Sequence, residues 1–339
     1  MSYKVKVQSS GHEFTVEAHE SVLDGALRQG IILPYGCRNG ACGSCMGTVL
    51  SGSVDYANGL PPAISEADAA ASKALFCQAH PSGDLTIEVR EVDAVKDIEI
   101  KKLPCRVDRL EQLAHDVIRI YLKVPSSNRL QFLAGQYINV LLKDQSPRAF
   151  SIANAPHDDE FIELHIRYVE GGHFSGQVFH DLKEKALLRL EGPLGTYFLR
   201  EDSERPLILI GGGTGFAPLK GMLEHAFYTG IQRPLRLFWG ARSRRDLYLE
   251  ELPLRWLMEH NNFNYTPVLS EPRPEDSWTG ESGLVTDSVV RHYPDLAKYD
   301  IYASGPPAMV KAGHRLFIEH GMDEAQFYSD SFEYAAPVD

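Results

Sequence analysis

Hydrophobic and polar residues alternate with a period of two at the start of the chain, and this pattern predicts a hairpin. The runs YKVKVQ and EFTVEA are joined by the turn sequence SSG. The next segment, SVLDGALRQG, has apolar residues at helical spacing, with Ser21 as a predicted N-cap and Gly30 as the stop. Further strands in GTVLSGSV and DLTIEVREV, and a short helix in SEADAAASKALFC, indicate a small β-rich domain over residues 1–93.

The pattern then changes twice along the chain. A mixed-charge stretch, residues 94–103, is typical of a linker. Residues 104–204 contain six short alternating runs, which predict a closed antiparallel barrel interrupted by one helix. In residues 205–339 the continuous apolar run PLILIG, a glycine-rich turn and an amphipathic helix precede the second buried run RLFWGA. That alternation predicts an α/β domain with a parallel sheet and helices on both faces.

Composition and charge narrow the class of protein. The chain has 339 residues, of which 43% are hydrophobic and 24% charged, as in ordinary globular proteins of two or three domains. Its formal net charge of -12 argues against nucleic acid and anionic membrane surfaces as partners. No apolar run approaches the roughly 20 residues of a membrane span, and the N-terminus lacks an apolar signal region. We therefore expect a cytoplasmic protein, in which thiols stay reduced.

Four of the five cysteines indicate a metal centre. Cys37, Cys42 and Cys45 have the spacing C-x4-C-x2-C, and Cys77 follows in LFCQA, which is the ligand pattern of a plant-type [2Fe-2S] cluster. Three glycines in the same stretch would relieve crowding around an inorganic core; they are Gly36, Gly40 and Gly43.

Two alternatives to a cluster are a zinc site and disulfides. Structural zinc usually needs a second short ligand pair, which is missing from the sequence. Disulfides fit poorly with an odd cysteine count and no secretory signal. The remaining cysteine, Cys105, is expected to be a small core residue.

The predicted cluster domain is acidic. Residues 1–93 contain six Lys and Arg against eleven Asp and Glu, a net charge of -5. An acidic rim around an exposed cluster would steer a basic partner. A merely solvated acidic surface explains the same count, so both interpretations stay open.

With these residues in view, residues 1–93 resemble a plant-type ferredoxin, which implies a β-grasp (α+β) fold. The segment RAFSIAN resembles the flavin motif R-x-Y-S-x-x-N of the ferredoxin-NADP reductase superfamily. The resemblance implies that Arg148 binds a flavin phosphate and that Ser151 lies near the flavin N5. Phe150 replaces the usual Tyr, so the ring can stack but a phenol hydrogen bond is lost.

A second segment, IRYVEGGHFS, resembles the next flavin segment of the same superfamily. Its glycines would let backbone amides approach phosphate, and Ser175 is predicted to open a helix whose N-terminus favours an anion. FAD is favoured over FMN by the resemblance alone. The predicted flavin-binding residues here are Arg167, Gly171, Gly172 and Ser175.

The glycine-rich turn GGGTGFAP resembles the pyridine-nucleotide loop of that superfamily, in which the backbone meets the pyrophosphate and Thr214 the nicotinamide side. Further on, YASGPPAMV resembles the C-G-P-P motif, with Ser304 in place of the cysteine beside the nicotinamide. Ser151, Ser304 and Thr214 are therefore the predicted catalytic residues. The predicted nucleotide-binding residues are Gly211, Gly212, Gly213, Thr214, Gly215, Gly305 and Pro306.

Two further features concern the cofactors. Arg242, Arg244 and Arg245 follow the second strand of the α/β domain and would suit the 2'-phosphate of NADPH, whereas the nearby Asp246 suggests NADH. NADH is the preferred prediction, with NADPH possible. An aromatic residue near the C-terminus covers the flavin in many relatives, and Phe332 is the first candidate, with Tyr334 in reserve.

The domain order resembles that of the reductase components of multicomponent oxygenases. The resemblance implies an enzyme that passes electrons from NADH through FAD and the cluster to a partner protein, in the first instance an oxygenase. The oligomeric state is open, with a monomer as the default expectation. The segments WTGESGLV, FYSDSF and SIANAP also resemble CDP-6-deoxy-Δ3,4-glucoseen reductase, whose partner is a sugar dehydrase. A free-standing flavin or ferric reductase and a non-catalytic redox sensor remain as other hypotheses.

Overall fold

The computed structural model describes residues 2–332 and divides the chain into two compact units. The first unit ends at Glu99 and the second begins at Ile100, within the predicted linker. The further division of the second unit at residue 204 stays a prediction.

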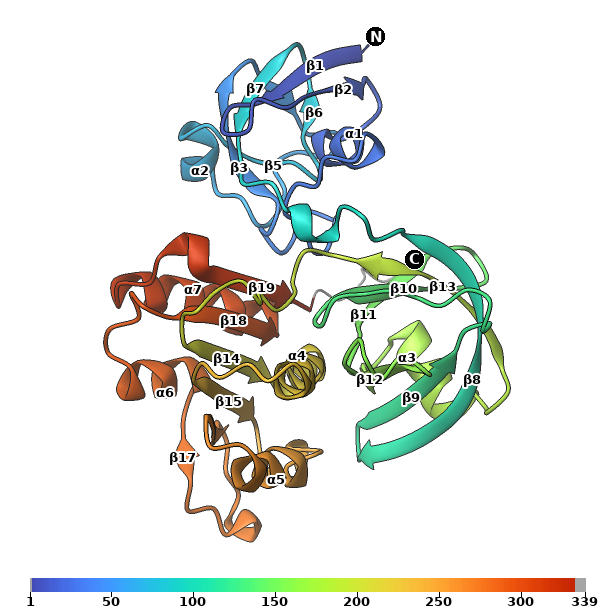
Figure 1. Cartoon of the computed structure of the whole chain (residues 1–339), viewed down its shortest axis with the longest axis vertical. Helices are drawn as coiled ribbons and strands as arrows, with labels where there is room; N and C mark the ends of the chain where they lie inside the picture. Colours follow the sequence, from blue (N-terminus) through green and yellow to red (C-terminus); the bar gives the residue numbers. More distant parts are fainter. Residues whose placement is uncertain (1, 333–339) are drawn as a thin grey trace. The chain divides into compact units, whose positions relative to one another are not determined.

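The first unit is a mixed five-stranded sheet with a helix against it (Figure 1). The sheet order is β2-β1-β7-β3-β5, with β1 antiparallel to β2 and parallel to β7. The predicted hairpin is confirmed. The main elements are β1 (Ser2–Val7), β2 (Glu13–Glu17), α1 (Val22–Arg28), β3 (Met46–Ser51), α2 (Glu66–Ala70), β5 (Lys73–Leu75) and β7 (Leu85–Glu88), and a two-stranded ladder joins β4 (Val54–Asp55) to β6 (His80–Pro81).

Local capping explains where α1 lies. The Ser21 side chain accepts a hydrogen bond from the Asp24 amide, as an N-cap does. Gly30 follows the helix with a φ of +75°, a conformation that glycine adopts without strain. The helix in SEADAAASKALFC is shorter than its sequence suggests, because Ser72 has a positive φ of 62° and strand β5 begins at Lys73.

The second unit begins with six antiparallel strands in the order β11-β10-β13-β8-β9-β12. The two outer strands approach each other just beyond β11, where the Ala153 amide donates to the Glu163 carbonyl at 2.8 Å. The six predicted runs thus form the predicted barrel. Its elements are β8 (Lys101–Ala114), β9 (Val117–Lys123), β10 (Tyr137–Leu141), β11 (Pro147–Ser151), β12 (Ile162–Arg167), α3 (His173–His180) and β13 (Leu187–Leu194).

The remainder of the second unit is a six-stranded parallel sheet, in the order β17-β16-β15-β14-β18-β19. One face packs on α4 and α5 and the other on α6 and α7, in two separate hydrophobic clusters. Figure 1 shows these layers. The elements are β14 (Leu207–Gly212), α4 (Phe216–Tyr228), β15 (Leu235–Ala241), α5 (Glu251–Glu259), β16 (Phe263–Leu269), β17 (Glu281–Ser282), α6 (Val285–His292), β18 (Asp300–Gly305), α7 (Pro307–Glu319) and β19 (Phe327–Ser331), with short 3-10 turns η1 (Asp93–Val95), η2 (Gly213–Gly215), η3 (Arg244–Asp246), η4 (Pro274–Asp276) and η5 (Glu324–Gln326).

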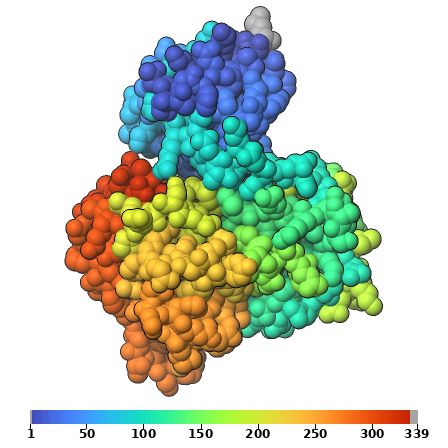
Figure 2. Space-filling view, in the orientation of Figure 1, coloured from blue at the N-terminus to red at the C-terminus, as the bar shows by residue number. Residues whose placement is uncertain are grey.

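The barrel and the parallel sheet share a core. Val117 and Ala134 of the barrel part lie in the same buried cluster as Leu209 of β14 and Met222 of α4. In Figure 2 the green barrel segments abut the yellow and orange segments of the sheet part. Residues from both parts can therefore build one site. Within residues 2–332 we find no helix that is both long and apolar enough to cross a membrane.

Candidate functional site

The cysteine loop, residues 36–45, lies between α1 and β3 in the first unit. Its backbone turns toward sulfur: the Cys37 amide donates to Cys42 Sγ and the Cys42 amide to Cys37 Sγ, each at 3.4 Å. The Cys42 thiol also donates to Ser44 Oγ at 3.3 Å. Gly40 and Gly43 have φ values of +81° and +82°, so glycine is needed for these turns.

The predicted fourth ligand comes from a separate segment that is held beside the loop. The Phe76 amide donates to the Cys45 carbonyl at 3.1 Å. The start of α1 fixes the same segment, because the Leu23 amide donates to the Phe76 carbonyl at 2.9 Å. Cys77 is thereby brought to Cys45, and both side chains are buried.

The four sulfurs lie in two pairs. A hydrogen bond from Cys42 lowers the pKa of the Cys37 thiol to about 7, and the same contact, together with burial, raises the pKa of Cys42. A hydrogen bond with Cys45 likewise lowers the pKa of Cys77 and raises that of Cys45. Two sulfur pairs with amides pointing at them fit two irons held by two thiolates each. A single tetrahedral zinc ion would need all four sulfurs close together, and no three of them lie within 4.8 Å of one another.

The flavin motif lies on β11. Arg148 donates to Ser146 Oγ at 3.3 Å and to the Pro147 carbonyl at 2.9 Å. Among residues 2–332 no carboxylate lies within ion-pair distance of Arg148, so its charge is available to a phosphate. Phe150 packs against Phe174 of α3, with ring centroids 5.5 Å apart.

The second flavin segment forms a tight turn into α3. The helix begins at His173, with Gly172 as its N-cap, two residues before the predicted start at Ser175. The Ser175 hydroxyl accepts from the Val169 amide at 3.1 Å and donates to backbone carbonyls, so it holds the turn together. Gly171 has a φ of +73°. An anion at this helix end would meet backbone amides rather than the Ser175 hydroxyl.

The glycine-rich turn lies between β14 and α4, as predicted. A Cβ on Gly215 would lie 2.0 Å from the Ser304 carbonyl oxygen, and one on Gly212 would lie 2.8 Å from Pro306 Cδ. The predicted Gly211–Gly215 and Ser304–Pro306 segments therefore meet, with Gly211 in register with Ser304. Thr214 is half-buried in the turn.

Ser304 has an orphaned polar atom. Its side chain is fully buried, and its Oγ has no hydrogen-bond partner among residues 2–332. Because a buried hydroxyl without a partner is costly, this atom marks a place where a polar ligand group would be accepted. The position is the one predicted for the nicotinamide side.

A single contact joins the flavin and nucleotide motifs. Ser151 Oγ donates to Asp330 Oδ2 at 2.7 Å, and Asp330 of β19 is in register with Ser304 of β18. Arg167 Nη1 would lie 2.5 Å from a Cβ on Gly213, so β12 also reaches the turn. We call Ser151, Asp330, Ser304 and the Gly211–Gly215 turn the junction.

One predicted residue lies beside the junction, and one residue of the junction itself was not predicted. The Phe332 amide donates to the Gly305 carbonyl at 2.9 Å, which ties the predicted aromatic residue to the C-G-P-P-like segment. Tyr334 lies outside the described residues. Asp330 was not predicted from the sequence, since nothing in SDSF indicates that its carboxylate meets a serine 179 positions earlier.

Asp246 is already engaged. Its Oδ2 accepts hydrogen bonds from the Ser243 amide and from Ser243 Oγ, both at 2.9 Å, and so caps η3. Arg242 is exposed, and Arg244 and Arg245 are exposed with long contacts to carboxylates, of 3.4 and 4.0 Å. The other carboxylate oxygen, Oδ1, has only long contacts, 3.9 Å to His115 and 4.0 Å to Arg245, and can still accept from a ribose hydroxyl.

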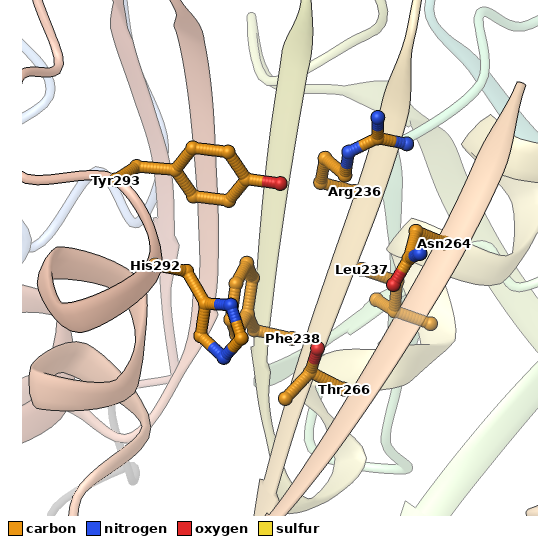
Figure 3. A pocket seen from close by; sticks show the side chains of 7 residues that line it. All are labelled: Arg236, Leu237, Phe238, Asn264, Thr266, His292 and Tyr293. Carbon is orange, nitrogen blue, oxygen red and sulfur yellow. The ribbon is translucent and has the colours of Figure 1, made fainter.

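A pocket of about 250 Å³ lies on the α6 side of β15 and β16 (Figure 3). Arg236 and Asn264 are the second residues of their strands, so the pocket is near the amino ends of the sheet. Ligands of such sheets bind beyond the carboxyl ends, where the glycine-rich turn lies. The pocket is therefore separate from the predicted nucleotide site. It is lined by Arg236, Leu237, Phe238, Asn264, Thr266, His292 and Tyr293.

Comparison with known protein families gives three matches along the chain. Residues 5–82 match the 2Fe-2S iron-sulfur cluster binding domain. Residues 104–198 match the oxidoreductase FAD-binding domain, and residues 209–315 the oxidoreductase NAD-binding domain. The first match favours the cluster over zinc for the sulfur pairs.

Several known proteins match this chain over nearly the whole length of both. The chain is 38% identical over 332 residues to the CDP-6-deoxy-L-threo-D-glycero-4-hexulose-3-dehydrase reductase of Yersinia pestis, covering 98% of this chain and 99% of the relative. It is 34% identical over 343 residues to the phenol hydroxylase P5 protein of Acinetobacter pittii, covering 99% and 96%. The crystal structure of the Amycolatopsis cytochrome P450 reductase GcoB has a TM-score of 0.77 at 32% identity, covering 97% and 98%.

Proposed function

Because the chain belongs to the family of oxidoreductases that join a 2Fe-2S cluster domain to FAD-binding and NAD-binding domains, we propose that it is the reductase of a two-protein system. In this proposal electrons pass from NADH through FAD and the cluster to a separate acceptor protein. The contact that carries the proposal is the 2.7 Å hydrogen bond from Ser151 to Asp330, which brings the flavin motif to the nucleotide motif.

The groups of this chain have separable tasks in the proposal. When bound, FAD accepts an electron pair from NADH and can release it one electron at a time to a one-electron cluster. Arg148 supplies a free guanidinium for the flavin phosphate, and Asp330 orients the Ser151 hydroxyl. The close-packed Gly215 and the orphaned Ser304 hydroxyl shape the place for the nicotinamide.

In this proposal the cysteine loop binds the cluster that passes electrons on to the acceptor protein. The proposed ligands are Cys37, Cys42, Cys45 and Cys77. Amide hydrogen bonds to Cys37 and Cys42 stabilise thiolate charge and tune the potential of a bound cluster. A partner would receive the electrons here.

The donor is proposed to be NADH, as the family implies. One oxygen of the Asp246 carboxylate caps η3 and the other can meet a ribose hydroxyl, whereas the exposed Arg242 offers a cation where a 2'-phosphate would lie. NADPH is therefore the second donor to compare, and Arg242→Ala should weaken NADPH more than NADH.

The names of the similar proteins indicate two classes of acceptor protein. The identity to the sugar-dehydrase reductase, 38%, exceeds that to the phenol hydroxylase protein, 34%, which makes a dehydrase the first acceptor to examine and an oxygenase the second. An enzyme that needs no acceptor, a free flavin or ferric reductase, is the third.

The deciding experiment supplies the purified holoprotein with NADH and either a sugar dehydrase or a terminal oxygenase component. We expect product formation with one of them, dependent on this chain. Rapid NADH oxidation with ferricyanide, but no electron delivery to either acceptor, would support the free-standing reductase instead. No NADH oxidation with ferricyanide at all would leave the redox-sensor hypothesis.

A further inference from the structure

Lys220 is a buried lysine one helical turn past the glycine-rich turn. Only 5% of it is exposed, on α4. A lysine soon after a glycine-rich loop is often a phosphate ligand. Here all three ammonium donors are already used within the protein, because they bond to the Ala153 carbonyl at 3.2 Å, to Glu163 Oε2 at 3.2 Å and to Glu224 Oε2 at 2.9 Å.

Two of those three acceptors belong to the barrel. Ala153 lies two residues after Ser151, and Glu163 is on β12. The backbone of α4 is equally close, since a Cβ on Gly221 would lie 2.8 Å from the Asn154 carbonyl oxygen. Helix α4, which starts at the glycine-rich turn, is therefore held against the backbone that follows Ser151.

Glu163 also connects, through hydrogen bonds, to a second segment of the nucleotide-binding part, at Tyr248. Its Oε1 lies 2.8 Å from His165 Nε2, and His165 Nδ1 lies 3.0 Å from the Tyr248 hydroxyl. A carboxylate only accepts, so Nε2 carries the proton and Nδ1 accepts from Tyr248. Burial lowers the pKa of His165, which keeps the ring neutral in this role.

Tyr248 leads back to the glycine-rich turn. Its ring meets Trp239 edge-on, with centroids 5.2 Å apart, and Trp239 Nε1 donates to the Gly213 carbonyl at 2.9 Å. Strand β12 thus reaches the nucleotide turn along two routes, one through Lys220 and α4 and one through Tyr248 and Trp239. Both routes start at the Glu163 carboxylate.

We propose that the Lys220–Glu163 pair sets the register between the nucleotide turn and Ser151, so that Lys220 is a positioning residue for reduction of the flavin by NADH. The inference rests on the proposed function. Its physical basis is that transfer between two bound groups depends steeply on their alignment, and a displacement of about 1 Å costs on the order of 100-fold in rate. In this proposal Lys220 itself contacts neither the flavin nor the nicotinamide.

The test compares variants of the holoprotein in anaerobic stopped-flow reduction by NADH, followed by flavin absorbance. Lys220→Met would leave the buried Glu163 charge with only Arg119, at 3.6 Å, as a positive neighbour, so the double variant Lys220→Met/Glu163→Gln, which removes both members of the pair, is the main one. We expect its reduction rate at saturating NADH to fall about 10- to 100-fold. Its FAD content and half-saturating NADH concentration should change much less.

Two further variants separate positioning from general loss of stability. Arg233→Met breaks another buried ion pair, Arg233 Nη1 to Asp300 Oδ2 at 3.0 Å, at the amino end of the sheet and away from the junction. It should lower the melting temperature without changing the saturated rate. Tyr248→Phe removes one hydroxyl and no charge, keeps the ring on Trp239, and should lower the saturated rate by a smaller factor than the double variant.

The inference fails if the double variant and Tyr248→Phe both reduce flavin at the wild-type rate, or if Arg233→Met slows it as much as the double variant does. A wild-type holoprotein that NADH does not reduce would contradict the proposed function itself. The two failures are therefore distinguishable.

Discussion

In the cysteine loop three of the four proposed ligands lie within nine residues, whereas at the junction Ser151 meets Asp330 across 179 positions of sequence. The loop is shaped by its own glycines and amides. The junction depends on the barrel and the parallel sheet, which share a core, meeting in register. A substitution in the loop should therefore remove one cofactor, while a substitution at the junction should leave the cofactors bound and slow the transfer between them.

The largest expected effect is that of Cys42→Ala. Losing one of four thiolates should abolish the cluster and with it delivery to a protein acceptor, while NADH oxidation with ferricyanide continues through the flavin. Iron and labile sulfide content, measured beside acceptor turnover, tests this. The control is Cys105→Ala in β8, a buried thiol whose pKa burial raises to about 12 and which should keep its iron.

Next in size is Gly215→Ala, which would force a Cβ against the Ser304 carbonyl at 2.0 Å. Because that neighbour is backbone, the turn must shift, and overpacking of this kind costs about 1–3 kcal/mol of stability. We expect NADH to bind more weakly and the FAD content to stay unchanged. Gly176→Ala, whose Cβ would have nothing within 4 Å, should behave as wild type in NADH titrations.

A smaller effect is expected from Asp330→Ala, which leaves Ser151 Oγ without its acceptor. Loss of orientation should slow flavin reduction about tenfold, equivalent to about 1.4 kcal/mol in the barrier. The saturated rate in single-turnover reduction measures this directly. Ser329→Ala, on the opposite face of the same strand, is the matched control, and an equal slowing in both variants would argue against the junction.

The last comparison concerns acid stability, and the effect expected there is on folding rather than on electron transfer. Burial by itself raises the pKa of Glu163, but the His165 hydrogen bond and the Lys220 and Arg119 charges lower it to about 2. A depressed carboxyl pKa stabilises the fold above the unfolded value of 4.5, and the contribution is lost as the pH falls toward 2. We expect about 3 kcal/mol from Glu163 over that range.

Glu20 in the first unit has a similar pKa, lowered to about 2 chiefly by its hydrogen bond to Arg28. That pair lies at the surface, with Arg28 45% and Glu20 15% exposed, so it should contribute only about 0–1 kcal/mol. Urea unfolding of Glu163→Gln and Glu20→Gln from pH 6 to pH 3 compares the two sites. Equal flattening of both pH profiles would contradict the difference in burial.

The patterns that the sequence predicts well are local ones. Period-two runs gave the hairpin and the six barrel strands, and the cysteine spacing located a loop whose sulfurs pair as a cluster requires. Local prediction was less accurate at the ends of helices, where Ser72 and Gly172 set the boundaries through their backbone conformations.

The residues that the sequence did not predict act over long distances. Asp330 and Lys220 look like an ordinary strand aspartate and an ordinary helix lysine, and only the packing of the barrel against the sheet gives them partners. Asp246 shows the reverse case. Its sequence position suggested NADH, and the sequence did not indicate the local role that the structure adds, in which one carboxylate oxygen caps η3 through Ser243.

The central claim is that electrons from one donor, NADH, reduce first the flavin and then the cluster of this chain. Anaerobic titration with NADH, followed by visible absorbance and electron paramagnetic resonance, tests it most directly. We predict complete reduction at about 1.5 equivalents of NADH per chain, because the flavin takes two electrons and the cluster one, together with the signal of a reduced [2Fe-2S] centre. Flavin bleaching that ends at about one equivalent, with iron present but no reduced-cluster signal, would contradict the claim.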